Sequence, residues 1–143
     1  MGSSRSNRRP EEEVRQRLIH YMNEKCGFPK SAIAVEKSLK ELPYLSHISN
    51  PRRIDIVCFA KGIHPDHPLS PLLLVECKAG AISEAAVTQA FGYNAEVKAP
   101  FILLAGPKEL RLYFPNGDGK IDYLPHLLSY QELVSRAKGL HGG

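Results

Sequence analysis

The chain contains a run, Leu72-Leu73-Leu74-Val75-Glu76-Cys77-Lys78, in which four aliphatic residues lead directly into a segment with two charged ones. A short apolar run of this kind predicts a strand that is buried on both faces. Because successive side chains in a strand point to opposite faces, Glu76 and Lys78 are expected on the face that carries Leu72 and Leu74. That face therefore begins apolar and becomes charged at one end.

A second apolar run, Arg53-Ile54-Asp55-Ile56-Val57-Cys58-Phe59, also contains a carboxylate. β-Branched and aromatic residues favour strands, whereas aspartate is depleted in them. By the same alternation, Asp55 shares a face with Arg53 and Val57. If the two predicted strands pair, two carboxylates and one ammonium group converge at one end of the sheet.

Two carboxylates and an ammonium group can serve catalysis or only stability. Carboxylate oxygens bind hard divalent cations such as magnesium, which lower the pKa of a bound water and polarise a phosphate. A neighbouring lysine can orient that water or stabilise the charge that develops. The alternative is a structural ion pair of Lys78 with Asp55 or Glu76. Buried ion pairs stabilise proteins weakly, which favours a role beyond stability, but the residues alone leave both interpretations open.

The remaining pattern predicts a mixed α/β fold. Apolar spacing predicts helices over residues 11–25, 83–98 and 130–137, and strands over residues 33–35, 53–59, 72–78, 101–105 and 110–114. Ser83 is the expected N-cap of the middle helix. Glycine and proline in residues 61–71 predict turns there. This alternation of helices and strands argues against a helical bundle.

The composition is that of an ordinary globular protein. A length of 143 residues indicates one domain, and 43% hydrophobic with 24% charged residues is typical of globular chains. The sequence predicts neither a transmembrane helix nor a secretory signal. The three cysteines, Cys26, Cys58 and Cys77, lack CxxC spacing and are expected to be buried free thiols in a reducing, cytoplasmic compartment.

Charge divides the chain into two parts. Lys and Arg number 19 against 15 Asp and Glu, a net charge of +4, and Arg5, Arg8 and Arg9 lie in the first ten residues. Without these three, sixteen basic residues face fifteen acidic ones. We expect residues 1–10 to be a flexible basic tail, either solvated or in contact with phosphate. Residues 11–143 are expected to form a single, nearly neutral domain without a broad basic face.

Six short segments follow one another in order over about residues 10–115. They are Pro10-Glu11-Glu12-Glu13-Val14-Arg15-Gln16, Cys26-Gly27-Phe28-Pro29, Val35-Glu36, Arg52-Arg53-Ile54-Asp55-Ile56-Val57, Leu74-Val75-Glu76-Cys77-Lys78-Ala79 and Gln89-Ala90-Phe91-Gly92-Tyr93. Together they resemble the N-terminal nuclease domain of type I restriction enzyme R subunits, a branch of the PD-(D/E)xK nuclease superfamily. The resemblance implies a restriction-endonuclease-like core, with a mixed central β-sheet flanked by helices in the order αβββαβ.

The resemblance also implies a metal site. Asp55 and Glu76 would bind Mg²⁺ or Mn²⁺, and the backbone carbonyl of Cys77 would be a further ligand. Glu12 is the candidate for an acid from the first helix, although the run of three glutamates leaves its register open. For each member of that run, a charge run at a helix start is the alternative.

Four further residues take roles from the same resemblance. Lys78 would be the catalytic lysine, and Gln89 would join Asp55, Glu76 and Lys78 as a catalytic residue. Tyr93 lies one helical turn beyond Gln89, so both can reach the site from one helix face. Tyr93 and Arg15 would support the site or contact the nucleic acid.

The expected function is that of a cytoplasmic, metal-dependent endonuclease or exonuclease domain that hydrolyses DNA. It would act alone, as a homodimer or with partner proteins, and no association with a membrane is expected. The chain has no GxxxxGK[ST] phosphate loop, so it is not expected to be an ATP-driven motor by itself. The alternative is a catalytically inactive nucleic-acid-binding or regulatory module on a nuclease-like fold.

Overall fold

The computed structural model describes the backbone of residues 3–35 and 54–142, and the side chains of residues 10–35 and 54–140. These residues form a six-stranded sheet in the order β1-β2-β3-β4-β5-β6. The strands are β1 (Ile33–Val35), β2 (Ile56–His64), β3 (His67–Cys77), β4 (Phe101–Ala105), β5 (Leu110–Pro115) and β6 (Ile121–Leu124). The helices are α1 (Ser3–Lys25), α3 (Glu84–Val97) and α4 (Tyr130–Gly142), with a short 3₁₀ turn η1 (Lys30–Ala32).

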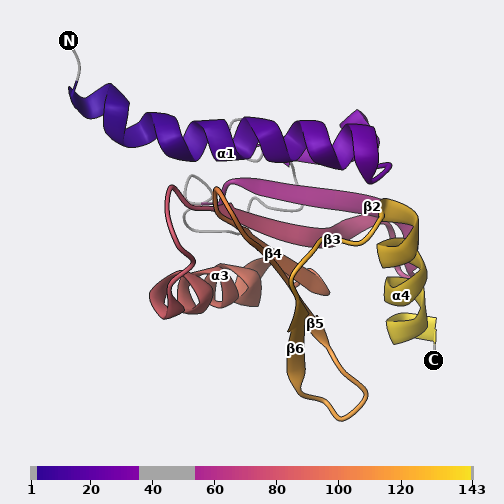
Figure 1. The fold of residues 1–143 in the computed structure, drawn as a ribbon. Helices are drawn as coiled ribbons and strands as arrows, with labels where there is room; N and C mark the ends of the chain where they lie inside the picture. The colour runs from indigo at the N-terminus through magenta and orange to yellow at the C-terminus, as the bar shows by residue number, and fades with distance from the viewer. Residues whose placement is uncertain (1–2, 36–53, 143) are drawn as a thin grey trace.

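The sheet is mixed and covered by helices on both faces. Strands β3 and β4 are parallel, whereas the other described neighbours are antiparallel. Helix α1 crosses one face, α3 lies against the other, and α4 packs beside β2 at the far end (Figure 1). This arrangement confirms the expected α/β restriction-endonuclease-like fold.

Strand alternation produces two apolar cores. Ile56, Cys58 and Val75 face α1 and α4 in one core. Val57 and Leu74 face α3 in the other. All three cysteines are buried and free, as the sequence predicts.

Local signals fix α3 between the parallel strands. The Ser83 hydroxyl caps its start by accepting a hydrogen bond from the Ala86 N–H at 3.1 Å, which satisfies one of the otherwise unpaired first-turn donors. At its end, Lys98 takes the left-handed conformation with φ 63°, and the Asn94 amide bonds both backbone groups of Ala99. The chain therefore turns directly from α3 into β4, and the carboxyl ends of β3 and β4 meet at one sheet edge.

The first helix is longer than the sequence predicts. It begins at Ser3 rather than near residue 11, and Pro10 lies inside it. The predicted start of the helix is therefore wrong, and the helix includes most of the residues that were expected to form a basic tail. Residues 3–9 are polar and carry no apolar periodicity, so the sequence contains no signal for a helix there.

The turn predicted over residues 61–71 is instead the end of a long β2–β3 hairpin. His64 pairs with His67 across its tip, and the register shifts between Cys58 and Phe59 and between Lys61 and His64. Proline cannot donate to a strand ladder, and Pro71 lies opposite Phe59, directly at a register shift. The strand predicted over residues 53–59 begins at Ile56, so Asp55 precedes β2. Arg53 lies outside the described residues.

Two other differences concern the end of the chain. Strand β6 was not expected, because its residues are mostly exposed and show no burial pattern. Helix α4 extends past residue 137 to Gly142. No helix in the described part of the chain is long and apolar enough to cross a membrane.

The loops that follow β3 and β4 touch at a glycine. A Cβ atom on Gly106 would lie 2.8 Å from the Gly80 carbonyl oxygen. The Gly106 N–H also donates to the Glu109 carbonyl at 2.9 Å, closing the turn into β5. The Gly80 backbone therefore leaves no room for a side chain at position 106.

We expect Gly106→Ala to lower the free energy of unfolding by about 1–3 kcal/mol, because the added methyl group must displace backbone. Gly92→Ala is the matched control, since Gly92 lies inside α3 and a Cβ there meets nothing within 4 Å. That change should stabilise the helix by about 0.5–1 kcal/mol. Urea denaturation measures both, and equal effects of the two variants would contradict the close approach of the loops.

Candidate active site

Asp55 is joined to β3 by its side chain. It stands one residue before β2, and its Oδ2 accepts a hydrogen bond from the Cys77 backbone N–H at 2.8 Å. Ile56 pairs with Val75, so the carboxylate lies at the end of β3 rather than within a strand face. The Cys77 side chain belongs to the α1-side core, and therefore only its backbone faces Asp55.

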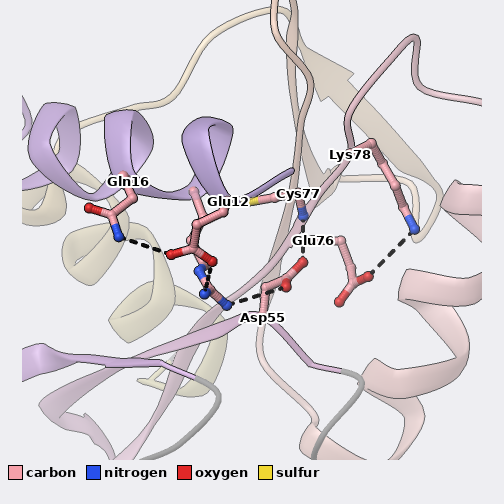
Figure 2. A network of polar contacts seen from close by, with 7 residues as sticks. Glu12, Gln16, Asp55, Glu76, Cys77 and Lys78 are labelled. Atoms are coloured by element: carbon pink, nitrogen blue, oxygen red, sulfur yellow. Dashed lines mark hydrogen bonds and ion pairs between the residues drawn. The ribbon is translucent and has the colours of Figure 1, made fainter. Parts of the chain in front are cut away.

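Glu76 is the buried acid of this edge. The residue is 3% exposed and is the one buried charged residue among those described. Its Oε1 has no hydrogen-bond partner in the described part of the chain, and its Oε2 lies 3.9 Å from the Lys78 Nζ. Figure 2 shows the Asp55 and Glu76 carboxyl groups beside each other, with Lys78 beyond Glu76.

Lys78 follows β3 directly and connects the acids to α3. Its Nζ donates a hydrogen bond to the Gln89 Oε1 at 3.2 Å. Gln89 comes from the second turn of α3, so the crossover helix contributes to the same cluster as β3. The structure thus brings together four residues from three separate segments: Asp55, Glu76 with Lys78, and Gln89.

Arg15 reaches the cluster from α1. Its guanidinium forms an ion pair with Glu12 and lies 3.9 Å from the Asp55 Oδ1. Glu12 also accepts a hydrogen bond from the Gln16 Nε2 at 2.9 Å (Figure 2). Arg15 therefore supports Asp55, while Glu12 is bound to its neighbours on α1.

Another member of the glutamate run acts on the acids. The charge of Glu11 contributes to raising the pKa values of Asp55 and Glu76. Helical phase contains the signal for this choice: Val14 and Leu18 are buried, and Glu11 stands three residues before Val14 on the same side of α1. Glu12, the candidate proposed from the sequence, is the next residue along α1 and therefore does not lie on the side that carries Val14 and Leu18.

Tyr93 lies further along α3 and packs, half-buried, against the α3-side core. It belongs to the apolar layer under the sheet, whereas Gln89 one turn earlier is exposed and bonded to Lys78. The two residues share a helix but differ in surroundings.

Burial shifts both acids toward their neutral forms. It raises the pKa of Glu76 to about 8, with a further contribution from the Asp55 charge, and Lys78 offsets only part of this. Burial also raises the pKa of Asp55, against the effects of the Cys77 N–H and Arg15. Two desolvated carboxyl groups that repel each other are stabilised by a cation placed between them.

The donor set suits a hard divalent cation. Within residues 10–35 and 54–140, no group of three or more His, Cys, Asp and Glu side chains is arranged to hold a metal ion. Asp55 and Glu76 supply two carboxylates, however, and one Glu76 oxygen is buried with no described partner. Because magnesium is commonly held by one or two carboxylates together with water and substrate phosphate, this pair fits such an ion.

Comparison with family models gives one match over most of the chain. The model described as type I restriction enzyme R protein N terminus (HSDR_N) matches residues 10–126. Neither the curated proteins nor the solved structures gave a match. The matched range includes the whole cluster of acids, Lys78 and Gln89.

The raised pKa of Glu76 predicts that the free energy of unfolding of the metal-free protein, measured with a chelator present, depends on pH. Between about pH 4.5 and about pH 8, the folded protein keeps a proton that the unfolded chain has lost. Stability therefore falls as pH rises through this window. Glu76→Gln should flatten the dependence and be the more stable protein at pH 8. Urea denaturation across this range measures it.

The control is Glu24→Gln, which removes an exposed carboxylate elsewhere on α1. It should keep the pH dependence of the wild type. If Glu76→Gln keeps it as well, the Glu76 carboxyl group titrates normally in the folded protein and the burial argument is wrong.

Proposed function

Because the chain belongs to the type I restriction enzyme R protein N-terminal family, we propose that it is a metal-dependent nuclease domain that hydrolyses DNA phosphodiester bonds. The observation that carries the proposal is the pair of carboxyl groups at the end of β3, of which Glu76 is buried and Asp55 is partly buried, with Lys78 beside Glu76. Three ionisable groups at the end of an apolar run cost stability, and such groups are typical of sites that perform chemistry.

Asp55 and Glu76 would hold a Mg²⁺ or Mn²⁺ ion, with the Cys77 backbone carbonyl as a further ligand. The bound ion would supply a water of lowered pKa and charge neutralisation at the scissile phosphate. Arg15 holds Asp55 from the α1 side, and the Cys77 N–H holds its other oxygen. Both contacts fix the orientation of the carboxylate before substrate binds.

Lys78 would stabilise the negative charge that builds on the phosphate during hydrolysis, or orient the attacking water. Gln89 would position it, since its amide oxygen accepts a hydrogen bond from the ammonium group. Because this bond links Lys78 to α3, the lysine side chain is oriented by a helix residue as well as by its own backbone. DNA is the proposed substrate, and partner subunits or a second copy of the chain are proposed to complete its recognition.

Metal binding can be tested without any activity. Mn²⁺ should raise the melting temperature of the wild type, because a ligand that binds only the folded state stabilises it, by about 2.7 kcal/mol at one hundred times its Kd. Asp55→Asn and Glu76→Gln should lose the shift. Glu24→Gln should keep it, as should Lys78→Ala, since an ammonium group is not a ligand. No shift in the wild type at saturating Mn²⁺ would rule out the metal site.

Cleavage is the second test. Lys78→Ala should slow hydrolysis of plasmid and single-stranded DNA in Mg²⁺ or Mn²⁺ by about a hundredfold or more, as for other lost transition-state contacts. Lys138→Ala, which removes an exposed lysine on α4, should cut like the wild type. If the wild type binds DNA and never cuts it, the alternative of a non-cleaving nucleic-acid-binding or regulatory module replaces the nuclease.

A further inference from the structure

The β5–β6 hairpin carries an arginine and two tyrosines on the sheet face of the candidate active site. Glu76 pairs with Leu104 on β4, and Leu104 pairs with Arg111 on β5. Directly paired residues point to the same face, so Arg111 stands in the same cross-strand row as Glu76. Two strand spacings separate their backbones by about 10 Å.

The aromatic side chains form a continuous row from α3 to the sheet edge. The Tyr113 ring lies 5.4 Å from Phe91 on α3 and 5.2 Å from Tyr123 on β6, measured between ring centroids. The Arg111 guanidinium carbon lies 5.3 Å from the Tyr123 ring centroid. Tyr123 is 51% exposed, so the outer end of the row is open to solvent. We name Arg111, Tyr113 and Tyr123 the Arg–Tyr surface.

Arg111 is anchored to the loop that follows Lys78. Its Nε donates to the Glu109 Oε2 at 3.0 Å, and its NH1 donates to the Tyr113 hydroxyl at 3.4 Å. The other Glu109 oxygen accepts from the Ile82 N–H at 3.5 Å. An arginine has five N–H donors, and these contacts use two of them. The guanidinium is therefore oriented by its neighbours and keeps donors for an anion.

We propose that the Arg–Tyr surface binds the single nucleic-acid strand that runs on from the candidate active site, with a base stacked on Tyr123 and a phosphate on Arg111. Exposed aromatic rings beside a cation are the combination by which proteins bind single strands, because every base has a π-face and every nucleotide a phosphate. A guanidinium binds a phosphate through paired N–H donors. The inference rests on the proposed function for the path of the strand.

The test measures binding in the absence of turnover. Fluorescence anisotropy with a labelled oligothymidylate in EDTA gives the Kd for the full chain. Tyr123→Ala should weaken binding about tenfold, whereas Tyr123→Phe, which keeps the ring, should bind like the wild type. Arg111→Gln should reduce the slope of log K against log salt by about 0.7, the loss of one single-strand phosphate contact. Tyr21→Ala is the control, since Tyr21 is also an exposed tyrosine but lies on α1.

Three results would overturn the inference. They are no binding of the oligonucleotide by the wild type, equal losses from Tyr123→Ala and Tyr21→Ala, and an equal loss from Ile121→Ala. Ile121 is 51% exposed on the same hairpin but has no ring to stack, so its equal effect would indicate an apolar protein-docking face. Failure of the nuclease proposal looks different: Glu76→Gln and wild type would both bind the strand through Tyr123, and neither would cut it in Mg²⁺.

Discussion

The Glu76 carboxyl group follows the apolar run of residues 72–75 near the end of β3, and its removal from water is the constraint on which the arrangement of the site depends. In real proteins, burying a charged group costs several kcal/mol even after the surroundings relax. The contacts of Glu76 offset only part of this desolvation cost. Lys78 lies 3.9 Å away, one carboxyl oxygen has no described partner, and the nearby Asp55 charge adds repulsion. A group placed in this way is stabilised either by a proton or by a cation.

The parallel pairing of β3 and β4 decides which residues can meet that group. A parallel pair requires a crossover, and here the crossover is α3. The helix therefore returns along the face that carries Glu76, and its second turn brings Gln89 to Lys78. The carboxyl ends of both strands lie at one edge, where ligands bind in open α/β sheets. The loops there are so close that one of them requires glycine at position 106.

The strands and helices that bury apolar side chains could be predicted from the sequence. The run of residues 101–105 and the capped helix that begins after Ser83 appear where their patterns place them. Strand β6 and the first turns of α1 could not be predicted, because apolar periodicity is the signal that such patterns carry. The residues of β6 are mostly exposed, and residues 3–9 are all polar in sequence. The hairpin at residues 61–71 was obscured because its register shifts admit glycine and proline.

The same limit applies to the candidate site. Asp55, Glu76 and Lys78 stand out in the sequence because charges interrupt apolar runs. Glu11 does not, since a run of three glutamates at a helix start has an ordinary explanation in the helix dipole, and only the phase of α1 against the sheet separates its members. Arg111 was missed for another reason: nothing in a local window relates it to Glu76. Their common row exists only through the register of three strands.

The two faces of the sheet differ in what they can tolerate, and this explains where the polar groups gather. The α1-side core contains the cysteines and residues from α1, α4 and the sheet, so a charge there would lie among apolar groups on every side. The other face is covered over fewer strands, because α3 packs on β3 and β4 while Tyr123 on β6 stays open to solvent. A charged group on that face can reach water or a ligand at the sheet edge. One face of the sheet therefore carries the polar groups Glu76, Lys78, Arg111 and Tyr123. The other face contributes to stability through apolar packing alone.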